Sequence, residues 1–326
     1  MTQYAFRRVI LLMPTLILMS MALFVSLRVL PPEDAVEREL AAAGIDDRES
    51  IELARRDLGL TGSLFSQYVD WLTGVVQGDF GKSIHSRRAI SEELTFRVPV
   101  SFELSVIGLF FTWAISFPLG VASAVFQDKA PDYFLRGGAY LLDSVPSFVI
   151  AILVLTYLAV YFNWAPPITF SNAWDDPVRH IRIMILPTFI IAVGSVGNLI
   201  RFTRTFLLEV LRQDYIRTAR AKGLTENTVL SRHAMRNVAL PFVTIIGGAI
   251  PGLLTSSVII ENLFNLPGMG RYLVGAAGNL DYPVIMTTTM FFAVIILISQ
   301  LLVDLSYAWL DPRVSYASGG GRRRGR

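Results

Sequence analysis

Residues 284–310 have the sequence VIMTTTMFFAVIILISQLLVDLSYAWL, in which Asp304 is the only charged residue. An α-helix needs roughly 20 predominantly apolar residues to cross the hydrocarbon core of a bilayer. This run exceeds that length and consists mostly of residues that favour lipid over water. It is therefore predicted to form a transmembrane helix.

Five further apolar runs of comparable length precede it, at residues 9–29, 100–126, 140–162, 183–202 and 242–260. The whole chain of 326 residues is 53% hydrophobic and only 17% charged, which is too little charge to cover the surface of a soluble domain. Each run is interrupted by Pro, Gly or Ser, as helices packed together in a membrane tolerate. The sequence predicts an all-α, polytopic membrane protein with six transmembrane helices.

The first run follows Arg7 and Arg8, as the apolar part of a signal peptide also would. It is longer than a signal peptide requires, and no small-residue cleavage site follows it. We therefore expect a retained membrane helix, with a cleaved signal as the alternative.

The distribution of basic residues predicts the orientation. With six spans both termini lie on one side, and the 203–241 loop on that side contains seven Lys or Arg residues. The two short loops on the other side contain only Arg179, Arg182 and Arg271. Because basic residues concentrate in cytoplasmic loops, we expect a multi-pass protein of the plasma (inner, cytoplasmic) membrane with both termini in the cytoplasm.

This orientation divides the chain into four parts. Residues 1–30 form the cytoplasmic N-terminus and first transmembrane helix, and residues 31–98 form a small helical extracytoplasmic segment. Residues 99–310 form a core of five transmembrane helices, and residues 311–326 form a basic cytoplasmic tail. Within the outer segment, the sequence predicts one helix over 37–58, stopped by Gly59, and another over 68–76.

Catalytic and metal-binding motifs are not evident in the sequence. It contains no Cys, and its three histidines, at positions 85, 180 and 233, have no metal-ligand spacing. Gly81-Lys82-Ser83 resembles part of a phosphate-binding loop, but Val76 stands where that motif requires glycine. No HExxH or nucleophile-elbow motif is present. We expect no enzyme activity and no cofactor on this chain.

The 215–241 loop has the sequence YIRTARAKGLTENTVLSRHAMRNVALP. It contains more helix start and stop signals than a loop that only sets the orientation of the chain in the membrane would need. Gly223 is placed to end a helix over 206–222, and Thr225 with Glu226 can start a second helix over 226–237. Pro241 would then open the fifth span. The second helix has Val229, Leu230 and His233 along one side and Arg232 and Arg236 along another. An apolar ridge with a basic flank is typical of a helix that docks in a groove of another protein.

This loop resembles the EAA loop of ABC-importer permeases, in which a helical insert separates a glycine from a proline. The segments that resemble the peptide/nickel branch of that family occur in the family's order: Arg7-Arg8 with Pro14, GDFGKS (78–83), DYIRTARAKGL (214–224), ENLFNLPGMG (261–270), DYP (281–283), and VD (303–304) with LDPR (310–313). The resemblance extends from the start of the chain to about residue 314. The chain departs from the family in three ways. RTA (217–219) replaces the Glu-Ala-Ala of the loop, the spacing from Gly223 to Pro241 is longer than in the general motif, and LPPED (30–34) replaces Leu-Pro-Gly-Asp-Pro.

The resemblance implies a type I ABC importer permease for di- or oligopeptides, with oligosaccharides or chelated nickel as alternative substrates. It implies pairing with a second homologous permease subunit, expected to give a heterodimer, together with two cytoplasmic ATP-binding subunits and an extracytoplasmic substrate-binding protein. ATP and Mg would bind the ATPase subunits. The lipid membrane is the other expected partner, and no nucleic acid is expected.

The resemblance also places ATPase coupling in the loop. The residues expected to take part are Arg217, Ala219, Gly223, Leu224, Thr225, Glu226, Val229, Leu230, Arg232, His233, Arg236 and Pro241. Among ionisable residues in the spans, Asp143 is the candidate for the translocation pathway. Glu103, Glu261 and Asp304 lie near span ends, and we expect them to lie near the headgroups or to pair with a neighbouring helix.

Two other classes of protein share six spans. A secondary transporter driven by an ion gradient would more often have internal repeats or paired charges near the midplane, which this sequence lacks. An intramembrane enzyme would need a catalytic motif. Both are less well supported than the importer permease.

Overall fold

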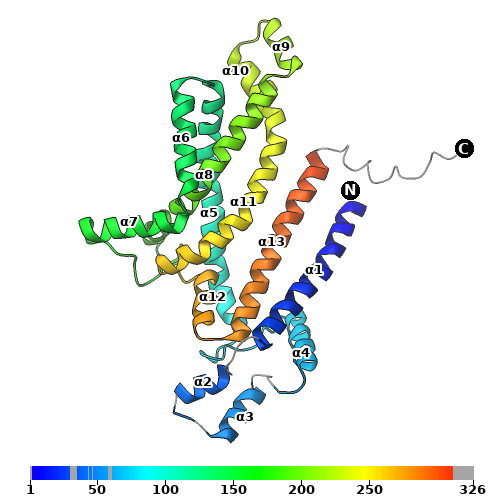
Figure 1. Cartoon of the computed structure of the whole chain (residues 1–326), viewed down its shortest axis with the longest axis vertical. Coiled ribbons are helices and arrows are strands. Elements are labelled where there is room, and N and C mark those ends of the chain that lie inside the picture. The colour runs from blue at the N-terminus through cyan, green and yellow to red at the C-terminus, as the bar shows by residue number, and fades with distance from the viewer. Residues whose placement is uncertain (1, 30–34, 43, 46, 58–60, 311–326) are drawn as a thin grey trace, which may run out of the picture.

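The computed structural model describes residues 2–29, 35–42, 44–45, 47–57 and 61–310 (Figure 1). Every regular element in this part of the chain is a helix. The elements are α1 (Thr2–Val29), α2 (Ala35–Ala42), α3 (Arg48–Asp57), α4 (Leu64–Gln77), α5 (Ile90–Val125), α6 (Ala130–Ser144), α7 (Ser147–Phe162), α8 (Pro177–Leu211), α9 (Asp214–Ala221), α10 (Glu226–Thr228), the π-helix η1 (Val229–Ala234), α11 (Met235–Leu263), α12 (Met269–Gly278) and α13 (Tyr282–Leu310). The tail over 311–326 lies outside the described residues.

Four of the described helices are long and apolar enough to cross a membrane: α1, α5, α8 and α13. The pair α6 and α7 qualifies as one more span, but it is bent by 90°. The expected fifth run falls inside α11, where several side chains lie outside the described residues. The bundle therefore has the length and composition of a multi-pass membrane protein.

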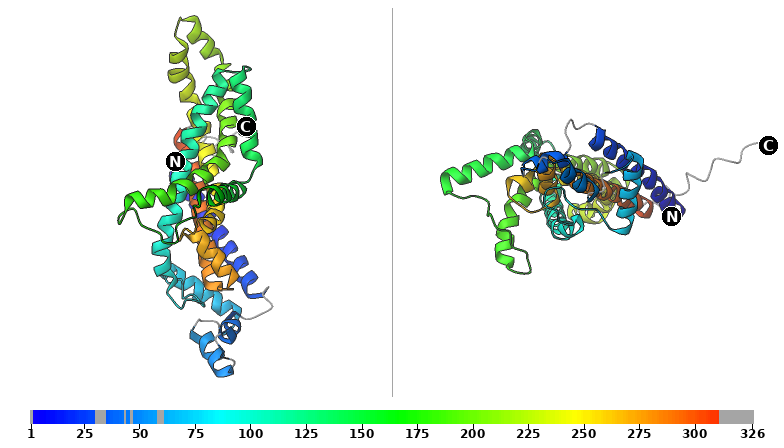
Figure 2. Two further views of the ribbon diagram at one scale, coloured as in Figure 1. Left: turned by 90° about the vertical axis from the view of Figure 1, so that its left-hand side faces the viewer. Right: turned by 90° about the horizontal axis from the view of Figure 1, so that it is seen from below.

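The prediction of one continuous helix over 140–162 is wrong. Helix α6 ends at Ser144, and α7 starts at Ser147 after Val145 adopts an extended conformation with φ −111° and ψ 116°. The ring of Pro146 disfavours the helical conformation for the residue before it, which explains the break at this point. Figures 1 and 2 show α7 leaving the side of the bundle while α6 runs along it.

Helix α8 forms the centre of the bundle. Ile191 on this helix and Leu104 on α5 are both buried in the main apolar cluster, with Leu253 and Ile260 of α11. Helix α6 approaches α8 very closely at Gly197, where an added Cβ would lie 2.2 Å from the Ala139 carbonyl oxygen. Only glycine fits at this crossing.

The outer segment contains two helices where the sequence predicts one over 37–58. Helix α2 ends at Ala42, and Asp47 starts α3 because its carboxylate accepts a hydrogen bond from the Ser50 backbone N–H at 2.8 Å. Gly59 lies outside the described residues. Helix α4 contains the predicted 68–76 segment and lies against α1, where the Tyr68 and Ser20 hydroxyls are 2.9 Å apart.

Helices α1 and α13 lie side by side in opposite directions (Figure 1). Arg8 Nη1 and Asp304 Oδ2 form an ion pair at 2.9 Å between them, so Asp304 pairs with a neighbouring helix as expected. The start of α1 and the end of α13 point toward the end of the bundle that holds α9 and α10. Helices α2, α3 and α4 lie at the other end.

Candidate coupling site and the charge network behind it

The 215–241 loop forms a tip that projects beyond the other helices at one end of the bundle (Figure 1). The predicted helix over 206–222 is interrupted: α8 ends at Leu211, and α9 starts at Asp214. Gly223 then ends this short helix with φ +79°, and its N–H donates to the Arg220 carbonyl at 2.9 Å. The left-handed conformation explains why glycine stands here.

The prediction of a separate helix over 226–237, closed by Pro241, is wrong. Helix α10 continues through η1 into α11 without a break, so Pro241 lies inside a long helix. Thr225 occupies the N-cap position, but its hydroxyl contacts the Thr228 hydroxyl at 2.9 Å and makes no side-chain bond to the backbone. The side chains of Arg236 and Pro241 lie outside the described residues.

The apolar ridge of the second helix faces the chain itself. Val229 is fully buried, and it packs with Ile216 and Ala219 of α9 and with Leu207 of α8. Leu230 is half-buried against the same cluster. The apolar side chains thus hold the two arms of the tip together, and the surface that stays exposed is mostly polar.

That remaining surface carries most of the other predicted coupling residues. The exposed ones are Arg217, Gly223, Leu224, Thr225, Glu226 and Arg232, and His233 is half-buried. Across the Gly223 turn, Arg220 Nε donates to Glu226 Oε1 at 2.7 Å and Arg220 Nη2 donates to Glu226 Oε2 at 3.2 Å. This hydrogen-bonded guanidinium lowers the pKa of the Glu226 carboxyl.

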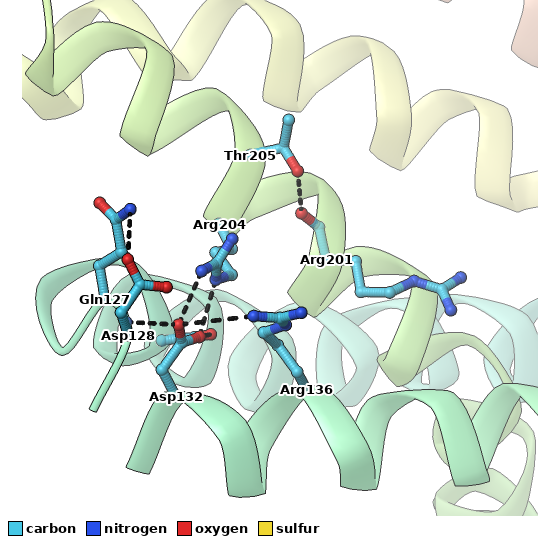
Figure 3. A network of polar contacts seen from close by, with 8 residues as sticks. Gln127, Asp128, Asp132, Arg136, Arg201, Arg204 and Thr205 are labelled. Carbon is cyan, nitrogen blue, oxygen red and sulfur yellow. Dashed lines mark hydrogen bonds and ion pairs between the residues drawn. The ribbon is translucent and has the colours of Figure 1, made fainter. Parts of the chain in front are cut away.

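A buried ion pair lies behind the tip, between α6 and α8 (Figure 3). The fully buried Asp132 carboxylate accepts hydrogen bonds from Arg204 Nε at 2.7 Å and from Arg204 Nη2 at 2.6 Å. It also accepts from the Ser123 hydroxyl at 2.6 Å and from the Asp128 backbone N–H at 2.9 Å. Arg136 Nη1 lies at 4.0 Å. The network ties the α5–α6 turn to the helix that leads into α9.

Sequence reasoning missed this network. Asp132 and Arg204 are 72 positions apart, and neither belongs to a motif. The sequence shows only that Asp132 precedes the 140–162 run and that Arg204 follows the 183–202 run, with nothing to pair the two.

The pathway candidate Asp143 lies at the same α6–α8 interface. It forms an ion pair with Arg201, whose guanidinium carbon lies 4.6 Å from the centre of the Tyr140 ring. Asp143 thus has a partner on the neighbouring helix, and its carboxylate lies beside Gly197 where α6 and α8 cross.

The other ionisable residues in the spans also have partners. Glu103 Oε1 and His180 Nε2 form a hydrogen bond at 2.7 Å. Glu261 is fully buried, and it accepts from the Ser101 hydroxyl at 2.7 Å and from the backbone N–H groups of Gly270 at 2.7 Å and Arg271 at 3.1 Å. It therefore fixes the first turn of α12 to α11.

Two motifs distant in the sequence bind one another at the opposite end of the bundle. The Ser83 hydroxyl donates to Asp281 Oδ2 at 2.5 Å, and the Ile84 N–H donates to Asp281 Oδ1 at 3.1 Å. The Ser83 hydroxyl of the phosphate-loop-like segment is thus engaged by a carboxylate, which would repel phosphate.

The fold is that of a multi-pass helical membrane protein, and a mostly polar tip projects from one end of its bundle. The sequence matches the family described as "Binding-protein-dependent transport system inner membrane component" over residues 116–316, and the N-terminal component of that system over residues 1–105. The chain belongs to this family. It is the permease subunit of an ABC importer and works with ATP-binding and substrate-binding partners.

Several curated relatives are similar over nearly their full length. The oligopeptide transport system permease protein AppB of Bacillus subtilis is 35% identical over 319 residues, which covers 97% of this chain and 100% of the relative. The dipeptide transport system permease protein DppB of the same organism is 35% identical, covering 98% and 100%. The glutathione transport system permease protein GsiC of Salmonella typhimurium is 34% identical, covering 97% and 100%.

A solved structure has the same fold. A chain of the MetNI methionine ABC transporter, in an inward-facing conformation, matches with a TM-score of 0.56 and 15% identity. The match covers 68% of this chain and 98% of that chain. It confirms the predicted type I importer permease fold.

Proposed function

We propose that this chain forms half of the translocation pathway of an ATP-driven importer of di- and oligopeptides. The observation that supports the substrate class is the set of full-length relatives, whose names specify oligopeptide, dipeptide and glutathione transport. All three substrates contain peptide bonds, which favours peptides over oligosaccharides or chelated nickel.

The tip formed by α9 and α10 is the proposed contact with the ATPase. It projects from the end of the bundle, and it is covalently continuous with α8 on one side and with η1 and α11 on the other. Movement of a docked ATPase would therefore act directly on two long helices. A conformational change that exposes the pathway to alternate sides needs a rigid element of this kind.

The coupling residues then have two roles. Arg217, Leu224, Thr225, Glu226 and Arg232 present the exposed surface, with His233 at its edge and Arg236 and Pro241 following in the chain. Ala219, Val229 and Leu230 hold the tip together from inside, and Gly223 sets the turn between its arms.

The remaining assembly follows from the same orientation. Both termini and the tip are cytoplasmic, a second homologous permease completes the pathway as a heterodimer, and two ATPase subunits bind ATP and Mg. The basic character of the 203–241 loop supports this orientation. The start of α1 also points toward the end of the bundle that holds α9, as it should if both are cytoplasmic. Asp143, held by Arg201, is the proposed charged residue of the pathway.

Uptake into vesicles tests this function. The chain is reconstituted with its partner permease, its ATPases and its binding protein, and labelled dipeptide, oligopeptide, oligosaccharide and chelated nickel are compared. We expect peptide uptake that requires ATP and persists without an ion gradient. Uptake of only a sugar or nickel would contradict the substrate, and uptake driven by an ion gradient without ATP would contradict the mechanism.

A further inference from the structure

Two adjoining cavities lie between α1, α4 and α13, and the site described above does not use them. The first, of about 220 Å³, lies at the end of α1 and the start of α13, and contains Arg28, Asp70, Asp79 and Lys82. The second, of about 350 Å³, lies further along the same two helices toward their middle. Trp71 and Phe80 line both cavities, so the two spaces share a wall.

The second cavity is apolar. Leu16 of α1, Leu72 and Val75 of α4, and Met290 and Val294 of α13 line it. An apolar cavity of about 150 Å³ can stay free of water and take up benzene, so a cavity of this size and composition suits a larger apolar group. Trp71, Leu72 and Val75, on one face of α4, line this space.

The outer face of α4 carries large apolar side chains. Phe65 and Val76 on this face are 77% and 81% exposed. Such side chains favour an apolar environment, so we expect this helix to lie against lipid, and Trp71 in the wall of the cavities is a residue type typical of the membrane–water interface. The charged cavity lies toward the end of the bundle and the apolar cavity toward its middle, which is the order of headgroup and acyl chain in a bilayer.

We propose that the two cavities bind one diacyl phospholipid with a zwitterionic phosphate–ammonium headgroup. An acyl chain occupies the apolar cavity. The phosphate lies near Arg28 and Lys82, and the primary ammonium lies near Asp70 and Asp79. Two cations and two carboxylates have no net charge, so they match a zwitterionic headgroup better than an anionic one.

Native mass spectrometry of the complete importer, purified in detergent, tests the site. We expect the wild-type assembly to retain phosphatidylethanolamine. Val75→Phe fills the apolar cavity and should abolish retention, whereas Val76→Phe, the same change on the exposed side of α4, should not. Absence of retained phospholipid in the wild type, or equal retention in both variants, would overturn the proposal.

A second measurement starts from the wild-type importer and so does not depend on how the cavity variants fold. Phosphatidylethanolamine added to delipidated wild-type importer should raise its unfolding temperature, because a ligand that binds the native state stabilises it. Arg28→Gln with Lys82→Gln should weaken the lipid's binding about tenfold, through loss of charge-assisted contacts. Equal stabilisation by phosphatidylglycerol would contradict the zwitterionic headgroup. Cross-linking of a cysteine at position 75 to the second permease subunit would assign the cavity to that subunit.

Discussion

Arg204 on α8 donates two hydrogen bonds to the buried carboxylate of Asp132 on α6, at 2.7 and 2.6 Å. The pair fixes α6 to the helix that continues into the tip. Gly197 allows the same two helices to touch further along, and the Asp143–Arg201 ion pair lies beside that contact. Helices α6 and α8 are thus joined at several points, and we expect them to move with the tip as one unit.

Replacement of Asp132 should destabilise the protein strongly. Asp132→Asn leaves Arg204 without its carboxylate in a buried site, and breaking a buried ion pair costs about 3–5 kcal/mol. Asp128→Asn is the matched control, since it makes the same change on an exposed residue in the same turn. Thermal unfolding in detergent checks the prediction, and equal shifts for the two variants would refute it.

The Gly223 turn should be essential for coupling. No atom lies within 4 Å of a Cβ added there, so Gly223→Val suffers only backbone strain, at about 1–2 kcal/mol for a left-handed residue. We expect ATP hydrolysis to continue while uptake into vesicles falls. Gly223→Asn tolerates the left-handed conformation and should retain most uptake. Normal uptake by the valine variant would disprove the assignment.

The ion pair across that turn should depend on pH in a defined direction. The Arg220 guanidinium lowers the pKa of Glu226, so the carboxylate form is the one the folded tip favours. The contribution of this ion pair to the stability of the folded tip is complete at pH values above the ordinary glutamate pKa. It is lost as the pH falls through the lowered pKa of Glu226. Solid-state NMR titration of labelled glutamate, assigned with Glu226→Gln, should show this pKa rising in Arg220→Gln. An unchanged value would mean that the pair does not form in the membrane.

The Ser83–Asp281 contact should hold the outer loop to α13. Ser83→Ala leaves one oxygen of a buried carboxylate without its hydroxyl donor, at a cost of about 1–3 kcal/mol. Hydrogen exchange over residues 81–90 should accelerate in this variant. Ser86→Ala, an exposed neighbour, serves as the control and should exchange like the wild type.

Much of the architecture follows from local sequence. The length of each apolar run predicts a membrane helix, because a helix that is apolar along 20 or more residues has no stable place in water. The end of α9 at Gly223 follows from the conformational freedom of that residue. The family could be identified from short segments in a fixed order.

The tertiary structure alone decided which groups meet. The sequence predicts that the ridge containing Val229 docks on another protein, yet Val229 is buried against Leu207 of its own chain. Apolar faces of one chain that can reach each other become buried together. Asp132 and Arg204, like Ser83 and Asp281, are joined across long stretches of chain that leave no periodic signal. Pro146 predicts a break in the helix, but the 90° bend between α6 and α7 depends on how the chain packs beyond that residue. Helix formation is local, and the sequence therefore determined it; the pairing of charges depends on distances in space, which only the folded bundle sets.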